Sequence, residues 1–330
     1  MKKNKAYALE LNVPVDTQKT FDSKDKLDTY LLEYYQRLEN TRAFEKIEIN
    51  PIFNENDDFV ETVLNVYVKD SFHLLAVPYP KYDSNSGFNL KLKAKDTNFL
   101  GSLNPLSTDI FLLLASSESD NKNNKVGFNF DFNYPFPIGK LRATWLNSDQ
   151  FYYVFGSKMP EWNFKTGLSL CLPFDNYSFT WAFNQYCINN LDYEIFNDSL
   201  YFVENGSFSS SINLVTFKNN STLVYSPSIS TTFNWDNNGI NIENSDLYGV
   251  TLSLAHSLSN SKIDWNNDFR NGYSASFSNA YSFNCQTLSF TPSVSFTGEY
   301  FTSFNISQLN KNGWEFFNYF GISSRIYSFY

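Results

Sequence analysis

Cysteine and histidine are scarce in this sequence of 330 residues, and their scarcity argues against several kinds of site. The three cysteines, Cys171, Cys187 and Cys285, are odd in number and show no Cys-x-x-Cys spacing. They therefore predict neither a disulfide framework nor a zinc site. The two histidines, His73 and His256, have no nucleophile or second metal ligand near them in the sequence, so we expect structural or surface roles for both.

Long apolar runs are missing as well. The longest one, residues 110–115, has six residues, whereas a helix that crosses a bilayer needs about 20. The sequence starts with the basic stretch 1–5, but no apolar segment of the length found in a signal peptide follows it. We therefore expect no transmembrane helix and interpret the chain as a mature or truncated form.

The sequence has few charged residues, and its net charge is negative. Charged residues make up 18% of the chain and the net charge is −9, so the basic field of a nucleic-acid-binding protein is absent and no nucleic-acid partner is expected. The sequence contains no Gly-rich phosphate loop, no Gly-x-Ser-x-Gly elbow and no His-Glu-x-x-His pair. We therefore expect neither an enzyme nor a site for a cofactor or metal.

Aromatic residues, in contrast, make up 19% of the chain, and 42% of all residues are hydrophobic. This is enough apolar material to bury a core or coat a barrel, which argues against a fully disordered chain. Charges are concentrated at the start of the chain: about a third of residues 1–70 are charged, compared with about an eighth of residues 71–330. The two segments are therefore expected to occupy different environments.

The first segment has a helical pattern followed by two strand patterns. Residues 27–38 carry apolar side chains at helical spacing, and Asp22 or Ser23 precedes them as a possible cap. The apolar stripe consists of Leu27, Tyr30, Leu31, Tyr34, Tyr35 and Leu38. Strands are predicted over 44–49 and 60–68, with a break and a polar turn at 51–58.

From Gly87 onward, apolar and polar residues alternate in stretches about as long as the 9 to 11 residues of a membrane-crossing strand. These stretches are 87–95, 126–134, 162–172, 177–183, 208–216, 225–235, 248–254, 273–285 and 288–296. Their apolar positions are rich in Phe, Tyr and Leu, and their polar positions in Asn, Ser and Thr. A soluble β-sandwich would also alternate, but this composition favours an antiparallel barrel with a polar lumen, whose backbone groups are all paired within lipid.

Several motifs, in this order, resemble the outer-membrane assembly proteins of the BamA/TamA type, which belong to the surface antigen superfamily. The helix, the segment 38–49 and the segment 63–70 resemble a POTRA domain. The motifs that resemble the barrel entry, its first hairpin turn and later strand boundaries are residues 78–87, 95–101, 133–136 and 269–273.

The resemblance implies a mainly β fold with three parts. Residues 1–76 would form a small α+β POTRA-like domain in the periplasm, 77–86 a linker, and 87–330 a transmembrane antiparallel β-barrel in a bacterial outer membrane. Strand and turn lengths predict about 12 strands in the last part, whereas the family has sixteen, so the barrel is expected to be truncated. No counterpart of the family's luminal Val-Arg-Gly-Phe motif is found.

By the same resemblance, the protein would receive unfolded barrel proteins as clients and insert them through a seam in its own barrel. Client or partner strands would add to the edge formed by Val63, Leu64, Asn65, Val66, Tyr67 and Val68. The seam strand would contain Gly87, Phe88, Asn89, Leu90, Lys91, Leu92 and Lys93, whose lysines suit either a poorly sealed edge or a lumen. Outer-membrane lipid is an implied partner, and accessory lipoproteins and periplasmic chaperones are further ones.

Two other interpretations fit the same residues. One is a passive channel or surface-exposed barrel whose N-terminal domain plugs or anchors it. The other is a soluble secreted β-rich adhesin. The three differ in whether the chain needs lipid and whether other outer-membrane proteins depend on it.

Overall fold

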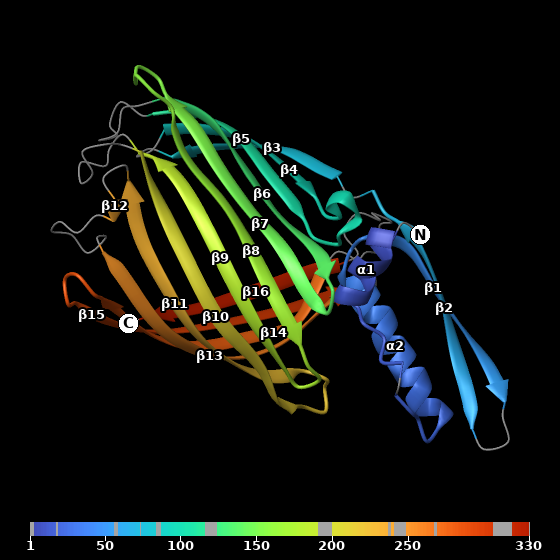
Figure 1. The fold of residues 1–330 in the computed structure, drawn as a ribbon. Coiled ribbons are helices and arrows are strands. Elements are labelled where there is room, and N and C mark those ends of the chain that lie inside the picture. Colours follow the sequence, from blue (N-terminus) through green and yellow to red (C-terminus); the bar gives the residue numbers. More distant parts are fainter. Residues whose placement is uncertain are drawn as a thin grey trace.

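The computed structural model describes residues 3–17, 19–55, 59–72, 74–83, 87–115, 124–190, 200–236, 239–240, 249–266, 269–305 and 319–329. In this part of the chain the fold is mainly β. A small N-terminal unit of two helices and a two-stranded sheet is followed by one large antiparallel sheet (Figure 1).

The N-terminal unit consists of α1 (Lys3–Asn12), α2 (Lys24–Asn40), β1 (Phe44–Glu55) and β2 (Val60–Asp70). The predicted helix is confirmed as α2, and the Ser23 side chain caps it by accepting a hydrogen bond from the Lys26 backbone N–H. The break predicted from residue 51 onward is wrong, because β1 continues through Pro51 and pairs with β2 as far as Glu55. An edge strand tolerates this proline.

The core of this unit lies between the helices and one face of the β1–β2 sheet. Leu38 and Tyr34 of α2 and Val13 after α1 are almost fully buried. Partly buried side chains from α1, from the segment between the two helices and from the sheet pack against them, namely Leu9, Val15, Phe44, Ile47, Ile49 and Val66. The sheet alone would be marginal in water, so this packing against α2 stabilises it.

The large sheet connects strands that are neighbours in the sequence. Its elements are β3 (Leu74–Asp83), β4 (Gly87–Asp96), the short 3-10 helix η1 (Phe99–Gly101), β5 (Leu106–Leu114), β6 (Lys125–Ile138), β7 (Leu141–Val154), β8 (Glu161–Pro173), β9 (Tyr177–Asn189), β10 (Leu200–Thr216), β11 (Thr222–Asp236), β12 (Gly239–Ile240), β13 (Val250–Asn266), β14 (Phe269–Asn284), β15 (Phe290–Asn305) and β16 (Tyr319–Phe329). Strands β3 to β11 and β13 to β16 pair in chain order, and β12 pairs only with β11.

Within the described residues of 87–330 the strand number agrees with the prediction of about 12, because β4 to β11 and β13 to β16 are twelve strands besides the short β12. The predicted linker is wrong for residues 77–83. These residues belong to β3, which pairs with β4 over its whole length. The sheet therefore starts one strand earlier than the sequence pattern indicated.

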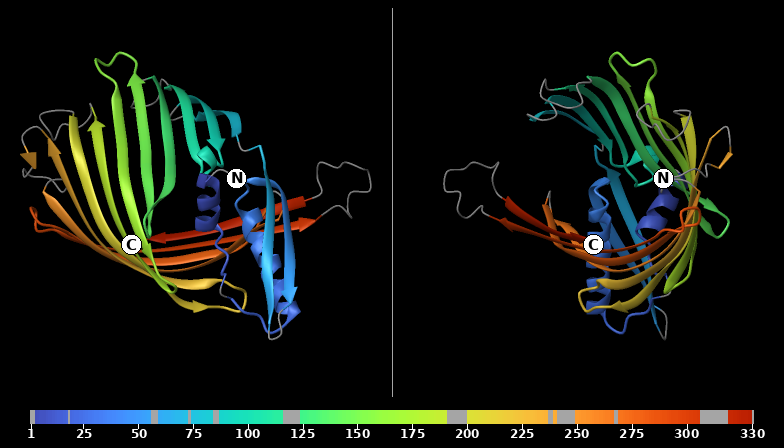
Figure 2. Two further views of the ribbon diagram at one scale, coloured as in Figure 1. Left: turned by 45° about the vertical axis from the view of Figure 1, so that its right-hand side comes forward. Right: turned by 90° about the vertical axis from the view of Figure 1, so that its left-hand side faces the viewer.

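The sheet curls, and the N-terminal unit lies at one end of its strands with α1 on the inner side (Figure 2). Helix α1 contacts β6 and η1, and α2 contacts β1 and β13. Residues 139–140 and 174–176 connect strands at this end. Strand β15 ends and β16 begins at this end as well, with residues 306–318 between them in the sequence, whereas β9 ends and β10 begins at the opposite end. None of the helices described is both long and apolar enough to cross a membrane.

Candidate functional site

One face of the large sheet is apolar and exposed. Antiparallel register places Ile229 beside Leu254 and Leu254 beside Tyr281, so apolar side chains form rows across the strands. The exposed fraction is 55% for Leu254 and 54% for Phe183. Exposed large apolar side chains occur on most strands of the sheet. A contiguous apolar surface of this kind is typical of faces that contact lipid or another protein.

The other face carries mainly small polar side chains. Ser253 and Ser282 lie 2.8 Å apart between their hydroxyl oxygens, and Asn205 Nδ2 donates to Thr232 Oγ1 at 2.7 Å. This face is the inner one, because Tyr7 of α1, which lies inside the curl, interacts electrostatically with Arg142 of the polar face of β7. Burial raises the pKa of Tyr7 and Arg142 opposes the shift. The inner wall thus offers hydrogen bonds to water or polar solutes.

Strands β3 and β16 end the sheet, and within the described residues they do not pair with each other. The ten-pair ladder between β3 and β4 is unbroken, so the residues whose N–H groups face β4 cannot be prolines. Pro78 and Pro80 therefore belong to the alternate set, with Ala76 and Tyr82, that faces the open edge. This edge presents carbonyl acceptors but lacks two central N–H donors.

The predicted seam strand is not at the edge. Strand β4 pairs with β3 on one side and β5 on the other, so Leu90 lies between Pro80 and Leu112. The seven predicted residues remain together on β4: Phe88, Leu90 and Leu92 share the apolar face, and Gly87, Asn89, Lys91 and Lys93 the polar face. The ammonium groups of Lys91 and Lys93 lie 5.9 Å and 5.1 Å from the ring centres of Phe111 and Tyr79. An open edge is instead formed by β3.

The predicted client-binding strand is β2, and it carries all six residues, Val63, Leu64, Asn65, Val66, Tyr67 and Val68. One edge of β2 pairs with β1, and no strand of the described chain pairs with the other edge. Val66 packs against the core under α2, whereas Tyr67 is 60% exposed on the opposite face. An extended peptide could therefore add to this edge through backbone hydrogen bonds.

A polar contact that the sequence did not reveal joins α2 to the end of β13. Asn40 donates from Nδ2 to Asp264 Oδ1 at 3.0 Å, and its Oδ1 accepts from the Trp265 backbone N–H at 2.8 Å. Gln36 Nε2 donates to the Trp265 carbonyl at 2.8 Å. The Arg42 guanidinium lies 4.2 Å from the centre of a Trp265 ring. We call these residues the rim contact.

The rim contact predicts the effect of Asn40→Leu. This change removes the three hydrogen bonds of the Asn40 side chain, two of them to β13 and one from Gln36 Nε2, and leaves the Trp265 N–H without its partner. We therefore expect the contact to lose about 1 to 3 kcal/mol. Hydrogen exchange at the Trp265 amide should become faster, as mass spectrometry of peptic peptides can measure. Glu39→Gln, at the adjacent exposed position, is the control and should leave exchange unchanged. Equal exchange in both variants would contradict a stabilising rim contact.

The remaining residues considered in the sequence analysis do not form a common site. His256 lies between the rings of Tyr225 and Tyr281, and His73 lies outside the described residues. Cys171, Cys187 and Cys285 are free thiols. In comparisons with known proteins, neither a family model nor a curated protein matches this chain.

Proposed function

We propose that this protein is an outer-membrane β-barrel of the assembly or translocation class. The observation that carries the proposal is the division of the sheet into a continuous, exposed, aromatic-rich apolar face and an inner Ser- and Asn-rich face. A curled sheet of this kind suits a lipid-facing exterior and an aqueous interior. The barrel would close, wholly or partly, by approach of β3 and β16.

The orientation follows from the position of the N-terminal unit. Bacterial barrels have their short turns on the periplasmic side and their longer loops outside the cell. The helical end of this sheet includes the shortest connections, such as 139–140. The N-terminal unit would therefore lie in the periplasm, where the free edge of β2 receives unfolded client proteins. The client would then reach the seam at β3.

Insertion into lipid can be tested with single-tryptophan variants in vesicles of brominated phospholipid. Trp145 and Trp181 are exposed on the apolar face, whereas Trp265 lies in the rim contact. Bromine on the acyl chains should quench the fluorescence of Trp145 and Trp181 strongly and that of Trp265 weakly. Equal, weak quenching at all three positions, with a protein that stays monodisperse in plain buffer, would favour the soluble adhesin.

The assembly function itself is tested by depletion in the cells that produce the protein. Loss of an assembly factor should lower the levels of many outer-membrane β-barrel proteins together, as quantitative proteomics of the membrane fraction would show. Unchanged levels of the other barrel proteins would contradict this function. They would favour a passive channel instead.

A passive channel is the second candidate, because α1 lies inside the curl and contacts β6 of the sheet. A helix in this position could plug a pore. Deleting residues 1–17 should then increase single-channel conductance in planar bilayers if the protein is a plugged channel. For an assembly protein, the same deletion should mainly reduce client insertion.

The edge of β3 gives a prediction about the seam. Pro78→Val combined with Pro80→Val supplies two N–H donors to the open edge, and each hydrogen bond formed with β16 should add about 0.5 to 1.5 kcal/mol. We expect the double variant to need a higher temperature before its folded gel band disappears. Tyr79→Val, whose N–H faces β4, is the control. A double variant that melts like the control would contradict closure of the seam between β3 and β16.

A further inference from the structure

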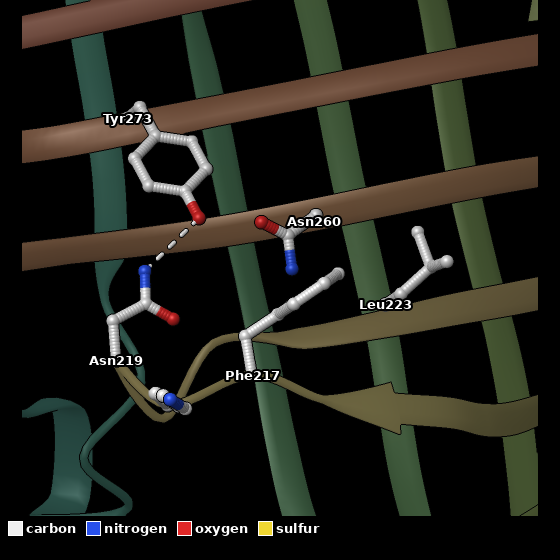
Figure 3. Close-up of a pocket in the computed structure, with 6 residues that line it drawn as sticks. Phe217, Asn219, Leu223, Asn260 and Tyr273 are labelled. Atoms are coloured by element: carbon white, nitrogen blue, oxygen red, sulfur yellow. Dashed lines mark hydrogen bonds between the residues drawn. The ribbon is translucent and has the colours of Figure 1, made fainter.

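A pocket of about 500 Å³ lies on the apolar face, beside the turn between β10 and β11 at the helical end of the sheet (Figure 3). It is lined by Phe217, Lys218, Asn219, Leu223, Asn260 and Tyr273. Register places Leu223 opposite Asn260, and Tyr273 is opposite Lys262, which is two residues beyond Asn260 on the same face. The pocket therefore combines strand residues from β11, β13 and β14 with a turn.

Hydrogen bonds hold the polar rim of the pocket. Asn219 Nδ2 donates to the Tyr273 hydroxyl at 3.3 Å, and the Ser221 hydroxyl lies 3.1 Å from the same oxygen. The Ser221 backbone N–H donates to Asn219 Oδ1 at 3.1 Å, which fixes the turn. Glu33 of α2 accepts a hydrogen bond from the neighbouring Asn220. The turn is thus anchored at both the sheet and the helix.

One donor in the pocket has no acceptor. Asn260 Nδ2 is buried and has no hydrogen-bond partner among the residues described, and Figure 3 shows its amide between Tyr273 and Phe217. Lys218 adds a positive charge, and none of the described carboxylates forms an ion pair with it. A buried N–H without a partner is costly, so an anionic acceptor placed here would satisfy the amide and the ammonium together.

The apolar part of the pocket narrows the choice of anion. Phe217 and Leu223 lie beside the polar groups, and Phe217 is exposed on the apolar face. A tyrosine and a lysine at the end of membrane strands occupy the level at which lipid headgroups lie. The geometry points to the phosphate of a phospholipid headgroup as the ligand, with the acyl chains along Phe217 and Leu223. This inference rests on the proposed insertion of the sheet into a bilayer.

The test measures lipid binding to the full chain in a neutral detergent. Native mass spectrometry would titrate dihexanoylphosphatidylglycerol, with inorganic phosphate and dihexanoylglycerol as separate competitors. We expect one saturable site for the phospholipid, with weak competition from either fragment alone. Lys218→Gln and the isosteric Asn260→Asp, which replaces the donor by a charge that repels phosphate, should each weaken binding about tenfold or more.

Lys140→Gln is the matched control, because Lys140 lies in another turn at the same end of the sheet and does not line the pocket. Equal binding by all variants would overturn the inference, and so would competition by inorganic phosphate as strong as that by the phospholipid. The brominated-lipid experiment reports insertion independently of the headgroup. Wild-type quenching with no saturable site would therefore reject the headgroup site alone, whereas absent quenching would reject the membrane proposal.

Discussion

Replacing Leu254 by arginine is expected to destabilise the protein strongly in lipid and hardly at all in plain buffer. Leu254 is exposed on the apolar face, in register with Ile229 and Tyr281. If this face contacts acyl chains, Leu254→Arg moves a charge into hydrocarbon, at a cost of about 2 to 4 kcal/mol near the middle of the bilayer and about 0 to 1 near its surface. Equilibrium unfolding in phospholipid vesicles, followed by tryptophan fluorescence, measures this cost.

Ala255→Arg is the matched control. Ala255 is the next residue of β13, lies at the same depth, and belongs to the polar face with Ser228 and Ala280 as its register partners. An arginine there can reach water inside the curl, so we expect a much smaller loss. If both variants unfold like the wild-type protein, or if Leu254→Arg only improves solubility, the apolar face does not lie in lipid.

Leu38→Ala should unfold the N-terminal unit selectively. The Leu38 side chain is 0% exposed and packs with Tyr34 and Val13 under the β1–β2 sheet. Removing a buried leucine side chain leaves a cavity and costs about 2 to 5 kcal/mol. A two-stranded sheet that depends on α2 for its stability cannot absorb that loss. Protease cleavage within residues 24–70, followed by mass spectrometry, should therefore become rapid.

Leu32→Ala provides the comparison on the same helix, because Leu32 is 71% exposed. This change should alter stability by no more than about 0.5 kcal/mol. The strands of the large sheet should remain resistant to protease in both variants, since the N-terminal core contains none of their residues. Cleavage spreading into the large sheet of the Leu38→Ala protein would show instead that the two parts unfold together.

The sequence predicted the elements whose side chains repeat with a clear period. The stripe from Leu27 to Leu38 is helical. Alternation after Gly87 indicated nine stretches, and strand and turn lengths predicted about twelve strands, which is the number that β4 to β11 and β13 to β16 make up within the described residues. Helix α1 was not predicted because the apolar residues of Lys3–Asn12 are crowded into 6–11 and do not form a single stripe along one face. Packing of Leu9 against the core stabilises this helix. In α1, contacts with the rest of the N-terminal unit therefore matter more for helix formation than the local sequence pattern does.

Strand β3 was not predicted from the sequence either, for a different reason. The resemblance to the BamA/TamA type implies a linker over 77–86, and the prolines Pro78 and Pro80 argue against a central strand there. Their spacing of two residues was the overlooked signal, because it places both prolines on one edge of a strand. The error displaced the expected seam by one strand, from β4 to β3. Strand β2, in contrast, forms where the sequence pattern predicted a strand, and within the described residues one of its edges is unpaired.

The rim contact could not be predicted from the sequence. Asn40 and Trp265 are separated by 225 positions, and neither belongs to a motif with a known spacing. Asparagine is abundant throughout this chain. The residues next to Asn40 in the sequence therefore do not distinguish it from asparagines that bind no distant backbone group. The exposed apolar face was predictable because its side chains recur at every second position along the strands, whereas a single polar contact between remote segments depends on the finished geometry.

The chain-order pairing of the strands has a consequence for how the molecule is assembled. Each strand from β4 onward can join the sheet by pairing with the strand immediately before it, apart from the short β12, so only short loops must close at each step and their entropic cost is small. The sheet can thus grow hairpin by hairpin as the polypeptide emerges. Asn40 must wait for the end of β13 before it finds its partners. The rim contact would therefore form only after most of the sheet has formed.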